Sequence, residues 1–213
     1  RQSGDLLKDA EVYVDPDRGV NTPEEALAGA CDILAERIAD DPEITDMVRT
    51  FTRETGVLTS EAADPDERTV YDMYYEYAES ISKIPNHRVL AVNRGEKEGF
   101  LSVTVLLDRE AALYALRTAV VKPRTPAAAF VSAACEDAYD RLIYPSLERE
   151  ARSDLTERAC EGAIQTFALN LKPLLMQPPV KGKVTMGLDP GYRMGCKVAV
   201  VDGTGKVLDT AVV

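Results

Sequence analysis

One apolar stripe extends from the Pro126 break to Met176 and constrains the fold more than any other feature of the sequence. Its members recur three or four residues apart, as on a slowly drifting helix face: Tyr139, Leu142, Ile143, Leu147, Leu155, Ala163, Ile164, Phe167, Leu171 and Leu174. The stripe predicts one very long helix, which Pro145 should kink because proline has no amide hydrogen to donate. A helix of this length connects domains or forms a spine for other elements, so we expect its charged residues between 148 and 152 to form a solvated face.

Two shorter helices are predicted upstream by their start signals. Thr22 precedes a proline at the first helical position and is followed three residues later by Glu25, the pattern of a capped helix start. Asp41 and Pro42 mark a second start directly after the first helix, and Gly56 is placed to end that helix in the left-handed conformation. We therefore expect two helices in tandem, an αα-hairpin or helix-turn-helix-like pair.

The middle of the chain predicts a small two-strand β element between further helices. Segments 57–63 and 100–107 have the composition and alternation of short strands that could pair. Helices are expected from His87 to Gly95, behind a cap at Asn86, and over 108–121. Tyrosines at 71, 74, 75 and 77 repeat at a helical spacing, which is more typical of core packing than of a platform for stacking bases.

Charge is divided unevenly along the chain. The 213 residues include 25 Lys and Arg against 36 Asp and Glu, a net charge of −11. From Lys181 onward five basic residues stand against three acidic ones, so this segment carries +2 and residues 1–180 carry −13. An acidic surface is repelled by phosphate backbones, so most of the chain should not lie along nucleic acid. The two compositions predict a helical domain over 1–177, a linker over 178–183 and a second domain over 184–213.

The four cysteines lack the close spacing of a metal site or a disulfide framework, and His87 is the only histidine. We expect all four to be buried small apolar side chains in a cytoplasmic protein: Cys31, Cys135, Cys160 and Cys196. No apolar stretch approaches the roughly twenty residues that span a membrane, so no membrane association is expected. The sequence begins without methionine and closes on an apolar run, so we expect a piece of a longer protein.

Residues 184–213 predict an antiparallel three-stranded meander. Apolar runs at 184–188, 197–201 and 206–213 are separated by a turn at Pro190 and Gly191 and by a strong hairpin signal over 202–205. Asp189 ends the first strand, the usual place for a carboxylate that orients a metal or a phosphate. One carboxylate cannot hold the paired cations of a phosphodiester nuclease, and capping of the following turn is an equally good account of it. The spacing of Gly191 and Gly195 matches no phosphate-binding loop, so we interpret both as turn glycines.

Several runs resemble one bacterial family in matching order. Residues 186–202, with 204–210 after them, are similar to the start of the YqgF, RNase H-like domain of the Tex transcription accessory proteins. Upstream, residues 84–99, 137–150 and 168–175 resemble the helical region of the same family. We therefore expect a mainly α fold, namely a multi-helix domain with a helix-turn-helix-like pair, a small two-strand β element and a long kinked helix. The first β-meander of an RNase H-like α/β domain should follow it.

The resemblance implies a fragment of a multidomain protein that binds RNA or DNA. The family's helix-hairpin-helix modules and its C-terminal OB-fold, which carries much of the RNA binding, are missing from this sequence. Nucleic acid would then be bound mainly through domains absent from this chain, with the transcription machinery as a further partner. Asp189 aligns with the first-strand carboxylate of RNase H-like resolvases, but the Tex version of the domain is regarded as having lost a full catalytic set. We expect an architectural scaffold with no enzymatic activity, no metal and no cofactor.

Local contacts with phosphates are expected from seven basic residues, which are Lys181, Lys183, Arg193 and Lys197 near the domain junction and Arg88, Arg94 and Lys97 in the helical region. Two other functional classes stay open. A metal-dependent RNase H-like nuclease or resolvase built on Asp189 would need at least two more carboxylates downstream. An actin-like or Hsp70-like phosphotransferase also opens with a strand, an Asp-x-Gly turn and a hairpin, although the long acidic helical segment counts against it.

Overall fold

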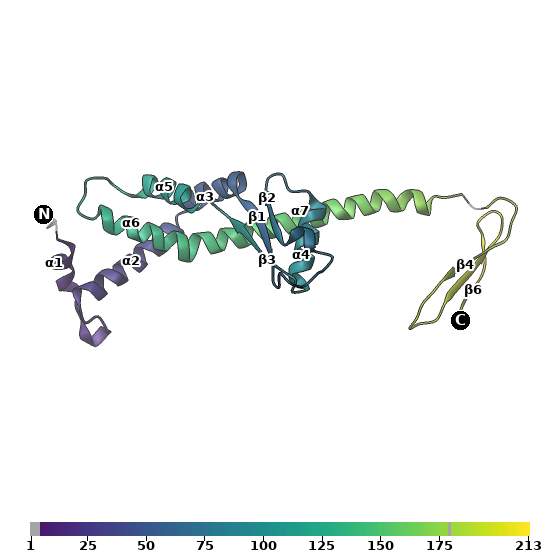
Figure 1. Cartoon of the computed structure of the whole chain (residues 1–213), viewed down its shortest axis with the longest axis horizontal. Helices are drawn as coiled ribbons and strands as arrows, with labels where there is room; N and C mark the ends of the chain where they lie inside the picture. Colours follow the sequence, from purple (N-terminus) through teal and green to yellow (C-terminus); the bar gives the residue numbers. More distant parts are fainter. Residues whose placement is uncertain (1–4, 179) are drawn as a thin grey trace. The chain divides into compact units, whose positions relative to one another are not determined.

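A computed structural model describes residues 5–178 and 180–213 of the chain. The chain divides into two units, residues 1–163 and residues 164–213, which are described separately below. The first unit, here called the helical unit, contains most of the helices and one sheet, and the second, here called the meander unit, contains a second sheet (Figure 1). The predicted linker over 178–183 includes residue 179, which lies outside the described residues.

Three short helices at the start of the helical unit lead into the predicted helix pair. The short ones are α1 (Leu6–Ala10), η1 (Glu11–Tyr13) and η2 (Pro16–Arg18) among the described residues, and the pair is α2 (Pro23–Ala39) and α3 (Pro42–Thr55). The Thr22 hydroxyl accepts a hydrogen bond from the Glu25 amide at 3.2 Å, and the Asp41 carboxylate accepts from the amides of residues 43 and 44. These side chains satisfy amides that have no partner within the helix, so both predicted starts are confirmed.

The predicted left-handed conformation of Gly56 is wrong, because its φ is −59°. Glycine is required at this position for a different reason. A Cβ atom here would lie 2.5 Å from the Thr52 carbonyl oxygen and 2.9 Å from Ile81 Cδ1. The end of α3 therefore packs directly against the residue that follows the second strand.

The sheet of the helical unit has three antiparallel strands, in the order β2-β1-β3, rather than the predicted two. They are β1 (Val57–Ala62), β2 (Glu76–Ser80) and β3 (Leu101–Leu106). The predicted pairing of 57–63 with 100–107 is confirmed. The tyrosine segment forms a single turn, η3 (Asp72–Tyr74), and then β2, because Tyr75 and Tyr77 also satisfy a strand alternation that pairing with β1 stabilises. Tyr71 and Tyr74 are buried, so their predicted role in the core is confirmed.

Two further helices flank β3, namely α4 (Asn86–Lys97) and α5 (Arg109–Val120). Pro85 occupies the N-cap of α4, so the predicted cap at Asn86 is wrong by one residue. Asp108 caps α5 by accepting a hydrogen bond from the Ala111 amide at 3.0 Å. Both helices thus begin where proline or aspartate fixes the preceding backbone.

The long predicted helix is present as α6 (Ala128–Asp137), a π-helical turn η4 (Ala138–Ile143) and α7 (Tyr144–Leu175), which follow one another without a break (Figure 1). Pro145 was predicted to kink the helix; the helix continues through it, and a π turn lies directly before it. The Tyr144 amide bonds to the carbonyl of Tyr139, five residues back, directly before the proline. A π turn is one of the recognised ways in which a helix absorbs such a disturbance.

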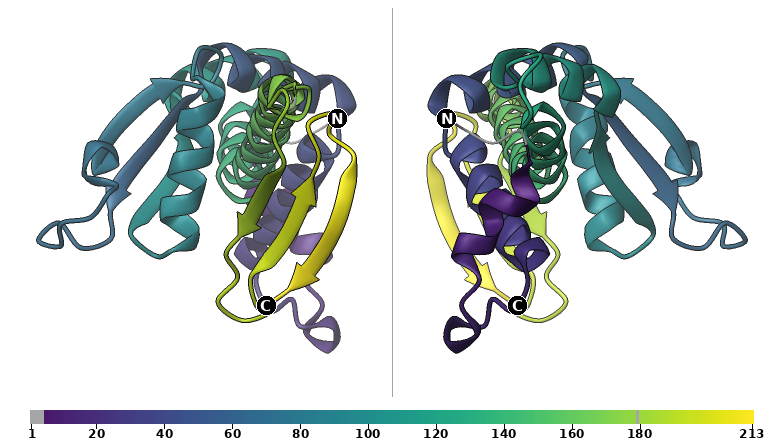
Figure 2. Two further views of the ribbon diagram at one scale, coloured as in Figure 1. Left: turned by 90° about the vertical axis from the view of Figure 1, so that its right-hand side faces the viewer. Right: turned by 90° about the vertical axis from the view of Figure 1, so that its left-hand side faces the viewer.

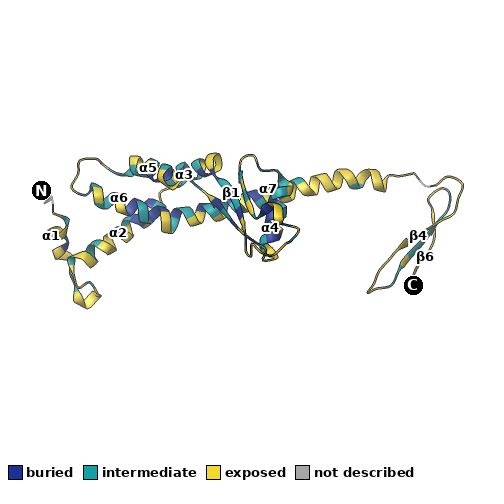
Figure 3. Ribbon diagram, in the orientation of Figure 1, coloured by how far each residue is buried: buried dark blue, intermediate teal, exposed yellow. Residues whose placement is uncertain are grey.

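Two hydrophobic clusters lie along this helix in the helical unit. Ala151, Leu155 and Ala159 of α7 pack with the sheet and α4, whereas Leu147 and the π turn pack with α2, α3, α5 and α6. Buried residues accordingly alternate with exposed ones up to position 159 (Figure 3). The helix is therefore the spine of this unit.

The cysteines are only partly as predicted. Cys135 is buried, Cys31 and Cys196 are half-buried, and Cys160 is exposed, so the expectation that all four are buried is wrong. Cys160 follows Ala159, which is the last buried position of α7, and is turned about 100° from it around the helix, away from the packed face. All four thiols are free.

The meander unit contains the predicted antiparallel meander. Its strands are β4 (Thr185–Asp189), β5 (Lys197–Val201) and β6 (Val207–Val212), in the order β4-β5-β6. The Asp202 carboxylate accepts hydrogen bonds from the Thr204 amide at 2.8 Å and from the Lys206 amide at 3.1 Å, which closes the predicted hairpin turn. Among the residues that the structure describes, no helix is long and apolar enough to cross a membrane.

Candidate nucleic-acid interface

The predicted basic residues of the meander unit lie at its two ends. Strand register places Asp189 opposite Lys197 and Thr185 opposite Val201, so these pairs are roughly 13 Å apart at about 3.3 Å per residue. Arg193 lies in the turn over 190–196, which leads into Lys197. Lys181 and Lys183 precede Thr185 at the opposite end. The four candidates are thus divided between the two ends of the sheet rather than gathered in one cluster.

The turn that carries Arg193 depends on its glycines. A Cβ atom on Gly191 would lie 2.4 Å from the carbonyl oxygen of Gly195, and Gly195 has a φ of +83°. Two hydrogen bonds between Cys196 and Val213, at 2.6 and 2.8 Å, connect the end of this turn to the last strand. Both residues are therefore turn glycines, as predicted.

A fifth basic residue, Lys206, lies at the Lys183 end and was not predicted. A Cβ atom on Gly203 would come within 3.2 Å of the Lys183 amide nitrogen, so the Lys183 backbone contacts the hairpin turn that leads to Lys206. Lys206 is exposed, as are the four predicted residues. Its position directly after the hairpin signal was the available clue.

Within residues 180–213, no basic side chain makes an ion pair, although three carboxylates lie in the same segment. Two of these carboxylates serve the backbone. Asp202 closes the hairpin, and Asp209 accepts a hydrogen bond from the Thr210 amide at 2.9 Å. The lysine and arginine side chains of the meander unit thus have no intramolecular carboxylate to give up when a phosphate binds.

Asp189 is exposed at the end of β4. It lines a surface hollow of about 620 Å³ together with residues of β5 and β6, among them Lys197 and Thr210. Among the described residues its carboxylate accepts no hydrogen bond, so it does not cap the turn that follows. The same part of the chain contains no group of three or more His, Cys, Asp or Glu residues placed to hold a metal ion.

The candidates on α4 have a different environment from those on the meander unit. Arg88 Nη1 lies 2.9 Å from Glu79, and Arg94 Nε lies 2.8 Å from Glu98. Hydrogen bonds from the Tyr77 hydroxyl and from Arg88 lower the pKa of Glu79 below its usual value. Burial and the Glu79 carboxylate raise the pKa of Tyr77 to about 12, so the phenol stays protonated as a donor. Arg88 and Arg94 therefore carry intramolecular salt bridges.

Lys97 is the third candidate on α4. It is exposed at the last residue of the helix, and no ion pair to it is found among the described residues. A cation at this end of a helix is favoured by the helix dipole, which is a structural reason for a lysine here that does not involve a ligand.

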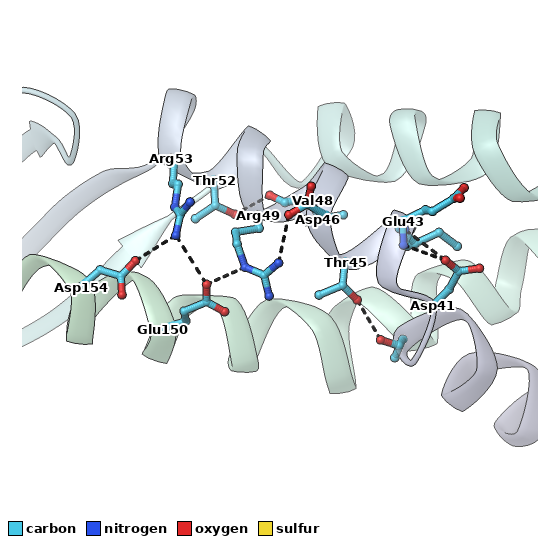
Figure 4. A network of polar contacts seen from close by, with 12 residues as sticks. Asp41, Glu43, Thr45, Asp46, Val48, Arg49, Thr52, Arg53, Glu150 and Asp154 are labelled. Atoms are coloured by element: carbon cyan, nitrogen blue, oxygen red, sulfur yellow. Dashed lines mark hydrogen bonds and ion pairs between the residues drawn. The ribbon is translucent and has the colours of Figure 1, made fainter.

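Other arginines of the helical unit hold its elements together. Arg49 Nε lies 2.6 Å from Glu150, and Arg53 lies 3.2 Å from Asp154, so two arginines of α3 bind two carboxylates of α7 (Figure 4). These side chains border a cavity of about 270 Å³ whose floor includes Leu155. Most guanidinium groups in the described part of this unit thus make contacts that hold its elements together.

Two models of one protein family match this chain, each over a different part of it. The family model described as Tex central region-like matches residues 2–167, and the one described as Tex protein YqgF-like domain matches residues 183–213. Uncharacterized protein YdcI of Bacillus subtilis is 45% identical over 216 residues, which cover 100% of this chain and 30% of that protein. Transcriptional accessory protein Tex of Neisseria gonorrhoeae is 33% identical over 220 residues, covering 100% of this chain and 29% of that protein.

A human relative has a name that states a ligand. S1 RNA-binding domain-containing protein 1 of Homo sapiens is 32% identical over 217 residues, which cover 94% of this chain and 22% of that protein. The chain thus spans less than a third of the length of these curated relatives.

Proposed function

The chain belongs to the Tex family, and we propose that it is the scaffold portion of a transcription accessory protein that contacts nucleic acid through its meander unit. The helical unit provides a spine and a partner surface, and the basic residues of the meander unit bind phosphates. The observation that carries the proposal is the difference in pairing. The five basic side chains of residues 180–213 make no ion pair among the described residues, whereas most of the arginines described in the helical unit are bound to carboxylates.

The names of two relatives support the nucleic-acid part of the proposal. One is called a transcriptional accessory protein and another an S1 RNA-binding domain-containing protein. We propose that the parent protein binds nucleic acid mainly through other domains, with the transcription machinery as a partner, and that it resides in the cytoplasm. The meander of this chain is proposed to be the first part of an RNase H-like α/β domain without catalytic activity.

Fluorescence anisotropy with a labelled single-stranded RNA tests the proposal. The variant carries four glutamines in place of Lys181, Lys183, Arg193 and Lys197. The matched control carries four glutamines in the helical unit, in place of Arg37, Lys83, Lys122 and Arg124. Both variants change the net charge from −11 to −15, so overall repulsion of phosphates is the same in both.

We expect the meander variant to bind RNA more weakly than the control at every salt concentration. Each phosphate contact contributes about 0.7 to the slope of log affinity against log salt concentration for single strands, so loss of four contacts should reduce that slope by roughly 3. Equal losses of affinity and slope in the two variants would show a general charge effect and would refute the assignment to the meander unit. The same titration with duplex DNA measures the preference between the two nucleic acids.

A further inference from the structure

The two outer edges of the sheet in the helical unit differ in whether their backbone groups have hydrogen-bond partners. The outer edge of β3 is closed by side chains of α7. Arg152 donates to the Val103 carbonyl at 2.9 Å, and the Val105 amide donates to Glu148 at 3.3 Å. The Tyr144 hydroxyl donates to the Val105 carbonyl at 3.1 Å. These side chains occupy three of the outward backbone groups of β3, so an added strand would have to displace α7 at this edge.

The outer edge of β2 is open. The Ala62 amide bonds to the Tyr75 carbonyl, and the Ile81 amide bonds to the Gly56 carbonyl. Because bonded and non-bonded pairs alternate in an antiparallel ladder, the amides and carbonyls of Glu76 and Ala78 point away from β1. Both residues are exposed, and no other group in the described part of the chain bonds to their backbone. Figure 2 shows this sheet, in blue and teal, at the periphery of the helical unit.

A surface hollow of about 730 Å³ adjoins this edge. It is lined by strand residues and by the segment that connects β1 to β2, and its apolar members include Met73, Tyr75 and Leu106. Met73 is 73% exposed and Leu106 is 49% exposed. Met73 and Tyr75 directly precede β2, so an added strand could gain side-chain contacts with them as well as main-chain hydrogen bonds, whereas Leu106 lies on β3 at the opposite edge of the sheet.

The charge around β2 specifies what can bind there. Residues 57–80 contain seven acidic residues and one basic residue, Arg68, which is paired with Asp72 at 3.2 Å. Glu61 and Glu76 are direct cross-strand partners, an arrangement in which like charges repel. A cationic side chain placed beside them would relieve this repulsion, and a phosphate backbone would add to it.

We propose that the open edge of β2 accepts an extended lysine- or arginine-rich segment of a partner protein as a fourth strand. Main-chain hydrogen bonds to Glu76 and Ala78 hold the segment, Glu61 and Glu76 select its charge, and the hollow accommodates its apolar side chains. This surface goes beyond the proposed nucleic-acid contact and is independent of it, because it lies in the helical unit and repels phosphates.

A fluorescein-labelled ten-residue peptide of alternating lysine and valine is the probe. Two matched peptides accompany it: one has glutamate in place of lysine, and the other is methylated at alternate backbone nitrogens and lacks half of its strand donors. On the protein, Ala78→Pro removes an outward amide at an edge position where proline is tolerated, and Ala78→Val keeps that amide. A thermal melt checks that each variant is folded.

We expect the lysine peptide to bind wild-type protein and Ala78→Val alike, and the glutamate peptide not to bind. Ala78→Pro and peptide methylation should each weaken binding about tenfold, the effect of losing one or two main-chain hydrogen bonds. If Ala78→Pro is unfolded, the comparison of the methylated and unmethylated peptides on wild-type protein still tests the main-chain hydrogen bonds. Binding that is indifferent to methylation, or displacement of the peptide by oligouridylate, would overturn strand addition.

Discussion

Replacing Gly95 by alanine should destabilise the helical unit, because α4 lies directly on β3 at this residue. An added Cβ atom would lie 2.6 Å from Leu101 Cδ1, 3.0 Å from Leu101 Cγ and 3.1 Å from Tyr71 Cδ1. Leu101 is 4% exposed and Tyr71 is 5% exposed, so neither side chain has free space to move into. The methyl group must therefore push the helix away from the sheet or force strained rotamers.

The size of the effect follows from two opposing contributions. Overpacking against two fixed neighbours lowers the free energy of unfolding by about 2–3 kcal/mol, and the better helix propensity of alanine over glycine raises it by about 1 kcal/mol. The net loss in the free energy of unfolding should be about 1–2 kcal/mol. Gly29, in α2, is the matched control, because nothing lies within 4 Å of its added Cβ atom. Gly29→Ala should stabilise the protein by about 1 kcal/mol through propensity alone.

Urea denaturation followed by far-UV circular dichroism measures both free energies. The two variants should differ by about 2–3 kcal/mol in opposite directions from wild type, with similar m-values. If Gly95→Ala is as stable as Gly29→Ala, then α4 does not pack on β3 as described. A change in m-value confined to one variant would instead show that its denatured or native ensemble has changed.

Three further outcomes are expected. Leu116→Ala should lower the free energy of unfolding by about 2–5 kcal/mol in the same urea titration, because this side chain is 0% exposed. Hydrogen bonding to Arg109 lowers the pKa of Asp140 below its usual value, so this carboxylate stabilises the fold above about pH 4 and the contribution is lost as pH falls through the folded pKa. Melting temperatures from pH 7 to pH 3 should accordingly fall less in Asp140→Asn than in wild type. Neither wild-type protein nor Asp189→Asn should cleave RNA or DNA in Mg²⁺ or Mn²⁺, and cleavage by wild type that the substitution abolishes would contradict the scaffold proposal.

The parts of the fold that could be predicted are those whose signals are local. Thr22, Asp41 and Asp108 mark helix starts because each side chain bonds to an amide two or three residues away. The alternation at 101–106 identifies a strand without knowledge of its partner. The π turn before Pro145 is a local response too, although the sequence indicates only that the helix must be disturbed there.

The parts that could not be predicted depend on residues distant in the chain. The tyrosine segment satisfies both a helical spacing and a strand alternation, and pairing of Tyr77 with Ser60 decides between them. Gly56 was predicted from its place at a helix end, but its conformation is set by Thr52 and by Ile81, which lies beyond the next two strands. Cys160 was expected in the core because cysteine is a small apolar residue. The structure exposes it, because its burial depends on which elements cover that face of α7.

Charge counting selected most of the residues of the candidate interface but could not rank them. By composition, Arg88 and Arg94 resemble Lys181 and Lys183, because a sequence shows how many charges there are and not which are paired. The fold places Glu79 and Glu98 beside the two arginines. Lys206 was not selected, although its position directly after the hairpin signal places it at the same end of the sheet as Lys183.

Net charge alone would assign phosphate binding to no part of this acidic chain, and the distribution of pairing changes that conclusion. A guanidinium that binds a carboxylate in a planar, two-point geometry is a structural element, and a phosphate that captured it would leave a carboxylate of the same protein beside the bound anion. Arg109, whose Nε and Nη2 donate to the two oxygens of Asp140 at 2.9 and 2.6 Å, is such a case. Under the proposed function, the lysines of residues 180–213 would exchange only water for phosphate. The small +2 segment should then contribute more to nucleic-acid affinity than the larger number of cations in the helical unit, which the anisotropy experiment measures.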